Sequence, residues 1–338
     1  VQVQINTNAA ALSPIEAERQ ITLPVELAMF GLPNVEEIRS ISKFGLSQVV
    51  VVFEEGTDLY FARQQVQERL VEARDQIPDG LGTPEMGPIS SGLGEVFQYT
   101  IEPAAPRAAG DTSAVDATEL RTLQDWVVAP QLRGVPGVAE VNSFGGFEKQ
   151  YQVLVRPEAL VQFDLTLQQV LDAVAENNQN AGGGYITQGA EQLVIRGVGQ
   201  VQDLDGIRNI VVTSRGGTPV RARDVADVVI GSTIRQGGVT KDGRGEVVTG
   251  IVMMRVGSNS RTVVEAVKEK FAVAARSLPA GVRLTAFYDR TELIDGAVST
   301  VEKALREAVV LVLIVLIVST ATSAVTFSIV SGDAVIND

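Results

Sequence analysis

Apolar residues recur every three to four positions in two segments of the chain, residues 59–77 and 264–278. This spacing puts apolar side chains on one face of a helix. Each segment follows a short apolar run, VVVVF at 49–53 and GIVMM at 250–254, which is typical of a buried strand. Each is followed by Pro-x-Gly, which ends a helix and starts a turn. The pattern therefore predicts the same strand–helix–turn arrangement at two places.

These two places belong to an internal repeat. The motif GLPNV, beginning at Gly31, recurs as GVPGV, beginning at Gly134, and residues 49–81 match residues 250–282 without a gap. Around both pairs the apolar pattern reads strand–helix–strand, strand–helix–strand. This βαββαβ order predicts an α+β fold with two ferredoxin-like units, each with two helices on one face of a four-stranded sheet. Because the matching segments lie much further apart in the second copy, that copy carries an insertion between its middle strands.

The expected elements follow from this alignment. The first copy has strands near residues 1–6, 35–42, 47–53 and 82–86 and helices near 14–30 and 58–76. The second copy has strands near 95–101, 138–144, 247–255 and 282–287 and helices near 118–133 and 262–278. The insertion carries a capped helix from Thr166, a flexible turn at Gly182–Gly184, and strands at 150–155, 192–196 and 220–230. Capping boxes at Ser13–Glu16 and Thr262–Glu265 mark two helix starts, the first with Pro at the first helical position.

The repeat also sets the expected domain boundaries. We expect a first unit at 1–94, a second unit split into 95–146 and 237–290, an inserted α+β subdomain at 147–236, an exit helix with a candidate transmembrane helix at 291–331, and a tail at 332–338. Residues 308–331 carry no charge, and about 20 apolar residues cross a bilayer core as a helix. The alternative is a buried helix of about 10–14 residues with a loose tail, because Ser and Thr become frequent after Val318.

Composition excludes several classes of chemistry. The 338 residues include 28 Lys+Arg and 41 Asp+Glu, for a net charge of -13, and there is no His or Cys. The chain therefore holds no thiolate nucleophile, disulfide or His-based zinc site, and we expect neither an enzyme nor a bound cofactor. The acidic balance also argues against broad nucleic-acid binding, which needs Lys and Arg. The chain begins at Val1 without a signal peptide, so we expect a fragment.

A cation site in this chain can use only carboxylates, amides, backbone oxygens or Met. Glu95 follows the glycine-rich segment 91–94 and opens an apolar strand, where it could be held at a cleft. Met253 and Met254 are neighbours on a strand and point to opposite faces, which favours core packing over a cation site. The acidic group around Asp58 lies at a strand-to-helix junction and is explained by helix capping.

Several ordered segments carry a resemblance to a known family. They are VQVQINTNA (1–9), FGLSQVVVVFEEGTDLYFAR (44–63), PEMGPISSGLGE (84–95), LQDWVVAPQL (123–132), PGVAEVNSFGGFEKQYQV (136–153), NNQNAGGGYI (177–186), RDVADV (223–228) and YDRTELID (288–295). Over about residues 1–317 the chain resembles the first periplasmic half of a resistance–nodulation–division (RND) efflux pump of the heavy-metal subfamily. The resemblance implies two pore subdomains, with the insertion as the docking subdomain.

The resemblance also implies function and setting. Such pumps are homotrimers of the bacterial inner membrane that exchange protons for metal cations. They work with a periplasmic adaptor and an outer-membrane channel, and residues 1 to about 305 would lie in the periplasm. The sequence lacks the family's first membrane helix and second half, so this chain alone is not expected to pump. It would supply the porter and docking portion.

The resemblance implies three site residues. Glu95 and Glu140 resemble cation ligands of zinc-type relatives, and Arg39 resembles a charged residue that lines the channel; each could instead be a solvated strand residue. Carboxylates favour zinc, cobalt or nickel over copper. Two other functions stay open: a non-transporting, trimer-forming remnant of such a pump, and a periplasmic domain of a protein-translocation accessory subunit. The second would not be expected to carry the insertion at 147–236.

Overall fold

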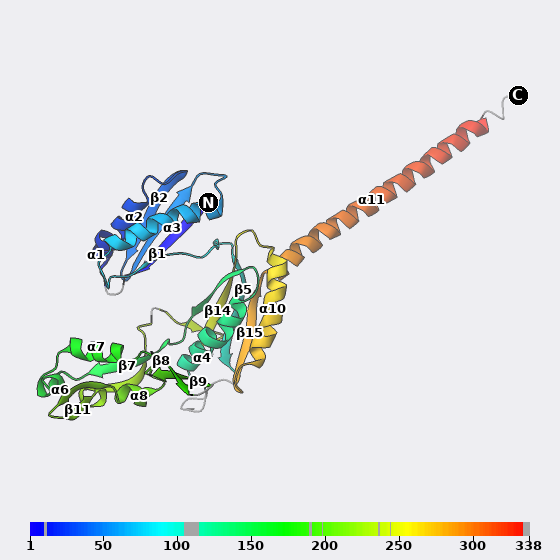
Figure 1. The fold of residues 1–338 in the computed structure, drawn as a ribbon. Helices are drawn as coiled ribbons and strands as arrows, with labels where there is room; N and C mark the ends of the chain where they lie inside the picture. Colours follow the sequence, from blue (N-terminus) through cyan, green and yellow to red (C-terminus); the bar gives the residue numbers. More distant parts are fainter. Residues whose placement is uncertain are drawn as a thin grey trace. The chain divides into compact units, whose positions relative to one another are not determined.

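The computed structural model describes residues 1–9, 12–104, 115–188, 191–197, 199–235, 237–243 and 245–333. The chain forms two compact units (Figure 1). Unit 1 comprises Val1–Gly94 with Arg255–Gly257, and unit 2 comprises Glu95–Met254 with Ser258–Asp338. Both units combine helices and strands, so the predicted mixed α+β class is confirmed.

Unit 1 is built on an antiparallel sheet with the strand order β2-β3-β1-β4. Its elements are β1 (Gln2–Asn8), α1 (Pro14–Ala17), the π-helical turn η1 (Glu18–Thr22), α2 (Leu23–Met29), β2 (Val35–Lys43), β3 (Leu46–Phe53), α3 (Leu59–Gln76) and β4 (Pro84–Met86). On β3 the alternate residues Val49, Val51 and Phe53 are buried. They pack with Val66 and Leu70 of α3 in one core, as the strand and helix periodicities predict.

The sheet of unit 2 repeats this strand order. β5 (Glu95–Pro103), β6 (Val138–Phe144), β14 (Glu246–Met254) and β15 (Val282–Asp289) pair in the order β15-β5-β14-β6, and the short β13 (Val239–Thr240) also pairs with β14. The helices are α4 (Ala117–Leu123), η2 (Gln124–Val128), α5 (Ala129–Arg133) and α10 (Ser260–Arg276). Asn259, and not Thr262, caps α10, because the Asn259 Oδ1 accepts from the Thr262 backbone N–H at 3.3 Å.

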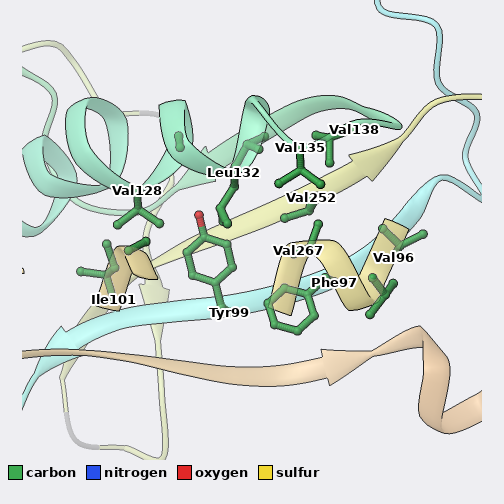
Figure 2. Packing of buried hydrophobic residues seen from close by; sticks show 14 of the residues in the cluster. Val96, Phe97, Tyr99, Ile101, Val128, Leu132, Val135, Val138, Val252 and Val267 are labelled. Atoms are coloured by element: carbon green, nitrogen blue, oxygen red, sulfur yellow. The ribbon is translucent and has the colours of Figure 1, made fainter. Parts of the chain in front are cut away.

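The core of unit 2 is centred on aromatic residues from β5. Figure 2 shows Phe97 and Tyr99 among Val128, Leu132 and Val267. Both rings also meet the ring of Phe271 edge-on, with centroids 5.2 Å apart in each pair. Such edge-to-face pairs add about 0.5–1.5 kcal/mol to the burial of the rings.

Both units contain a π-helical turn at equivalent places, and proline explains each. Pro24 and Pro130 stand just after η1 and η2. A proline inside a helix has no N–H to donate and its ring clashes with the preceding turn. The chain responds by widening that turn: the N–H of Leu23 bonds to the carbonyl of Glu18, five residues back. The sequence pattern predicts one continuous helix here and misses the bulge.

The insertion forms a subdomain with apolar clusters of its own. Its elements are β7 (Lys149–Val155), α6 (Pro157–Gln162), α7 (Leu167–Glu176), β8 (Ala181–Gln188), β9 (Glu191–Gly197), α8 (Leu204–Arg208), β10 (Val211–Arg215), β11 (Thr218–Arg221), α9 (Ala222–Val225) and β12 (Ala226–Ser232). The flexible turn predicted at Gly182–Gly184 is wrong, because these glycines lie within β8, which pairs with β9. The single strand predicted at 220–230 is interrupted by α9.

The exit helix α11 (Arg290–Asp333) follows β15 directly. The Asp289 carboxylate accepts from the Thr291 backbone N–H at 2.8 Å and so caps the start of α11. The transmembrane helix predicted within residues 291–331 is not supported: among the described residues, no helix combines the length and apolarity that crossing a membrane requires. The aliphatic run ends at Val318, and Ser319 and Thr320 follow it. Residues 334–338 of the predicted tail lie outside the described residues.

Candidate cation site on the sheet of unit 2

Two predicted ligands lie on either side of one methionine. Strand β14 runs between β6 and β5, and Met253 pairs with Glu140 on one side and with Glu95 on the other. Residues paired across antiparallel strands project from the same face of the sheet. Neighbouring strands are about 4.8 Å apart, so the two Glu Cα atoms lie roughly 10 Å apart with the Met side chain between them. Glu140, Met253 and Glu95 therefore form a row, which we call the carboxylate row.

The carboxylate row lies on the face of the sheet away from the core. Its neighbours Val252 and Val141 pair with each other and are buried. Met253 and Glu140 are half-buried, and Glu95 is exposed. A β-bulge between Val252 and Met253 brings Met253 opposite Glu95. A bulge of this kind re-aims a side chain and is common next to functional sites.

Each carboxylate of the row is held by an amide of its own strand. The Gln98 Nε2 donates to the Glu95 Oε2 at 2.9 Å, and the Asn142 Nδ2 donates to the Glu140 Oε1 at 3.0 Å. Both amides pair with Ile251, so they form the next row of the same sheet face. A donor on one carboxylate oxygen orients the group and leaves the other oxygen able to accept a cation. No group of three or more carboxylates suited to a metal ion occurs among the described residues.

The third predicted site residue, Arg39, belongs to unit 1. It is exposed on β2 of unit 1 and pairs with Val50 of β3, whose neighbours Val49 and Val51 are buried. Arg39 therefore projects from the open face of the sheet of unit 1. Glu95 and Glu140 thus share the sheet of unit 2, and Arg39 belongs to the sheet of unit 1.

Met253 is the member of the carboxylate row that the sequence does not single out. The sequence favours core packing for Met253 and Met254, but of these two only Met254 packs against the core of unit 2. The sequence shows that the two point to opposite faces and does not show which one faces the helices. The strand register, with its bulge, is the missing information.

A buried carboxylate at the other end of β5 is also missed by sequence reasoning. The Glu102 side chain is 9% exposed and accepts from Lys241 Nζ at 3.2 Å, Arg283 Nε at 3.0 Å and Thr285 Oγ1 at 2.7 Å. A cavity of about 430 Å³ lies beside it, lined in part by Asp116. Lys241 and Arg283 balance the charge of Glu102, and Arg283 and Thr285 belong to β15, so we assign Glu102 a structural role in joining β5 to β15.

The pKa values of Glu102 and Asp289 both lie below their usual values. Burial raises the pKa of Glu102. The hydrogen bonds from Thr285 and Lys241, with the charges of Lys241 and Arg283, lower the pKa by more than burial raises it. Burial also raises the pKa of Asp289, and hydrogen bonds from Lys268 and Thr291, with the Lys268 charge, outweigh it. Both groups therefore favour the folded state when they are ionised.

We expect the free energy of unfolding to fall in acid. A carboxylate with a lowered pKa stabilises the fold above its unfolded pKa, near 4.5 for Glu and 3.8 for Asp, and loses this effect as the pH drops through its folded pKa. Urea unfolding at pH 7, 5, 4 and 3 should show constant stability between pH 7 and 5 and a decline below 4.5. Thr285→Val removes one hydrogen bond to Glu102, so the free energy of unfolding of this variant should fall less steeply with decreasing pH. An equal decline in both proteins would contradict this role of Glu102.

Comparisons with known proteins agree with the family resemblance. Residues 1–330 match the sequence profile of the AcrB/AcrD/AcrF family. The chain is 50% identical over 316 residues to the cation efflux system protein CzcA of Alcaligenes sp. (strain CT14) and to the cobalt-zinc-cadmium resistance protein CzcA of Cupriavidus metallidurans. Each alignment covers 94% of this chain and 30% of the relative, so the chain spans about a third of the length of these relatives.

A solved structure agrees with the sequence relatives. A crystal structure of a heavy metal efflux pump matches with a TM-score of 0.81 at 35% identity, over 91% of this chain and 30% of that one. These relatives are named for efflux and resistance, and none of the names describes an enzyme. The resemblance derived from the sequence is therefore confirmed. The chain belongs to the AcrB/AcrD/AcrF family and, within it, to the heavy-metal efflux subfamily of RND pumps.

Proposed function

We propose that this chain is the porter and docking portion of a proton-driven heavy-metal cation efflux pump, and that the carboxylate row contacts the transported cation. The observation that carries the proposal is the register of β14, which puts Met253 between Glu95 and Glu140. Two negative charges on one face attract a divalent cation, and the two amides keep both carboxylates oriented. The remaining ligands would come from water or from other parts of the pump.

The ligand types indicate a class of cation. Carboxylate oxygens favour zinc, cobalt or nickel over copper(I), whereas a thioether adds affinity for softer ions. A site with two carboxylates and one Met is therefore suited to a borderline divalent cation. One relative is named for resistance to cobalt, zinc and cadmium, which agrees with this chemistry. The cation is a substrate here, and we assign the chain neither a cofactor nor an enzymatic activity.

The proposal also covers the architecture. The shared strand order of the two sheets supports two ferredoxin-like pore subdomains, at 1–94 and at 95–146 with 237–290. The insertion at 147–236 would be the docking subdomain, and Arg39 would line the channel. Membership of the family supports assembly as a homotrimer in the bacterial inner membrane, together with a periplasmic adaptor and an outer-membrane channel. Residues 1 to about 305 would lie in the periplasm.

A protein-translocation subunit is disfavoured by the folded insertion with its own apolar clusters. A trimer-forming remnant remains the second candidate. It predicts that the purified chain assembles but binds zinc no better than a variant without the carboxylate row.

Metal titration of the purified chain tests the proposal. We expect Glu95→Gln to lower the affinity for zinc and cobalt by about tenfold or more, because the loss of a partner outside the ligand shell alone typically costs 10–100-fold. Glu85→Gln is the matched control, since Glu85 is an exposed strand residue of unit 1, and it should bind like the wild type. Calorimetric titration with zinc, cobalt, nickel and copper(I) measures the affinities. Equal binding by the wild type and Glu95→Gln would overturn the proposed site.

A further inference from the structure

The chain passes twice between the sheet of unit 2 and the insertion. It leaves between β6 and β7, at residues 145–148, and returns between β12 and β13, where residues 233–235 and 237–238 are described. Hinges between folded parts are formed by a few loop or element-terminal residues of this kind. A cavity of about 370 Å³ lies at this junction and is lined by residues of both crossings, among them Gly145 and Arg235. The junction therefore contains room for movement.

The first crossing contains a bend that only glycine can make. Gly145 and Gly146 have φ of +81° and +67°. A Cβ on Gly145 would lie 2.6 Å from the Val247 backbone oxygen, and one on Gly146 would lie 2.6 Å from the Ala117 backbone oxygen. The bend is thus seated directly against α4 and β14. It is also tied there, because the Arg121 Nη1 donates to the Gly145 backbone oxygen at 3.0 Å.

Arg121 is itself fixed in place. Its Nε donates to the Asp125 Oδ2 at 2.6 Å, and the Asp125 Oδ1 accepts from the Ser143 Oγ at 2.6 Å. Ser143 in turn accepts from the Gln124 Nε2 at 3.2 Å, and Gln124 is fully buried. This hydrogen-bonded chain extends from the core of unit 2 to the bend at Gly145. The bend is therefore a fixed pivot point.

A single arginine of the return crossing contacts the groups around the pivot. The Arg235 guanidinium forms an ion pair with the Glu246 carboxylate of β14 and lies 4.5 Å from the centre of the Phe147 ring. The same Glu246 oxygen accepts from the Gly146 N–H at 3.2 Å. Arg235 thus links the return crossing to the first crossing and to the sheet. These contacts are partly exposed, so they can break without exposing a core.

We propose that the two crossings form a restrained hinge for the insertion, with Gly145–Gly146 as its pivot and Arg235 as its clamp. With Arg235 in place, the insertion is held in one orientation relative to the sheet. When Arg235 releases Glu246 and Phe147, the insertion turns about the pivot, which Arg121 continues to hold. This role is independent of cation binding by the carboxylate row, and it remains testable if that site is wrong.

Distance measurements by pulsed electron spin resonance test the hinge. The chain has no cysteine, so Val161→Cys in the insertion and Glu269→Cys on α10 give two unique label sites, both exposed. In this background we expect one narrow distance distribution. Adding Arg235→Ala should broaden it about twofold or more. Arg69→Ala, which removes an exposed ion pair of unit 1, should leave it unchanged.

Glu246→Gln provides a second variant of the clamp. It removes the charge that Arg235 pairs with and keeps an oxygen that can accept from Gly146. We expect partial broadening, with the circular dichroism of the wild type retained. If Arg235→Ala fails to fold, the width of the distance distribution in Glu246→Gln alone tests the hinge. A distribution as narrow as that of the parent in every clamp variant that folds would overturn the proposal.

Discussion

Replacing Gly250 by Val is expected to destabilise unit 2 by about 3–4 kcal/mol, since overpacking a core costs about 1–3 kcal/mol and the displaced ring also loses its polar and aromatic contacts. Gly250 lies in the middle of β14, where a Cβ would be 2.2 Å from the Tyr99 Cζ. The Tyr99 ring covers the glycine, and its hydroxyl donates to the buried Gln124 Oε1 at 3.0 Å. The ring has no space to retreat to, because it also packs against Phe97 and Phe271.

Urea unfolding followed by near-ultraviolet circular dichroism measures this effect. The buried rings of Phe97 and Tyr99 in unit 2 contribute to this signal, which is lost when their fixed packing is lost. Gly134→Ala is the control: a Cβ at Gly134 would meet its nearest atom at 3.6 Å, and its φ of −71° suits any residue. Tyr99→Leu should partly rescue Gly250→Val by making room. Unchanged stability of Gly250→Val would contradict the described packing of Tyr99 on β14.

The second large effect concerns the carboxylate row. Removing both charges, in Glu95→Gln/Glu140→Gln, should abolish measurable binding of zinc and cobalt, because neutral amides and one thioether are weak ligands for these ions. Met253→Leu keeps the volume of the side chain and both charges. It should leave cobalt binding nearly unchanged and weaken cadmium binding several-fold, since only the softer ion gains from sulfur.

The two carboxylates should therefore determine the affinity for zinc and cobalt, and Met253 should affect mainly the affinity for cadmium. A cobalt affinity in the double variant equal to that of the wild type would exclude the row as a cation site. Equal losses for cobalt and cadmium in Met253→Leu would show that Met253 supports the fold of the strand and is not a ligand. Circular dichroism of each variant separates these effects from unfolding.

The spacing of apolar residues, the helix caps and the Pro-x-Gly turns together predict most of the fold. The apolar spacing of residues 59–77 gives α3, the capping box at Ser13 gives the start of α1, and Pro-x-Gly gives the turns. The matching segments of the internal repeat predict two units of the same fold, because both units bury side chains at the same positions. The prediction is wrong where the backbone departs from regular helix geometry or where strand pairing decides the structure. Pro24 and Pro130 widen their helices, and the glycines at 182–184 pair within a hairpin.

The candidate site is only partly predictable, because it depends on pairing between distant strands. Glu95 and Glu140 are identified one at a time through the family resemblance. Their common neighbour Met253 emerges only from the register of β14 and its bulge. Glu102 is missed for a similar reason: its partners Lys241 and Arg283 lie far along the chain and meet it through the sheet.

The most direct test of the cation site is anomalous X-ray scattering at the zinc edge from crystals of the chain grown with zinc. The site predicts one peak on the open face of the sheet of unit 2, about 2.0–2.2 Å from an oxygen of Glu95 and of Glu140, with the Met253 sulfur as the nearest soft atom. A peak held only by other carboxylates, with Glu95 and Glu140 still bonded to their amides and to nothing else, would contradict it.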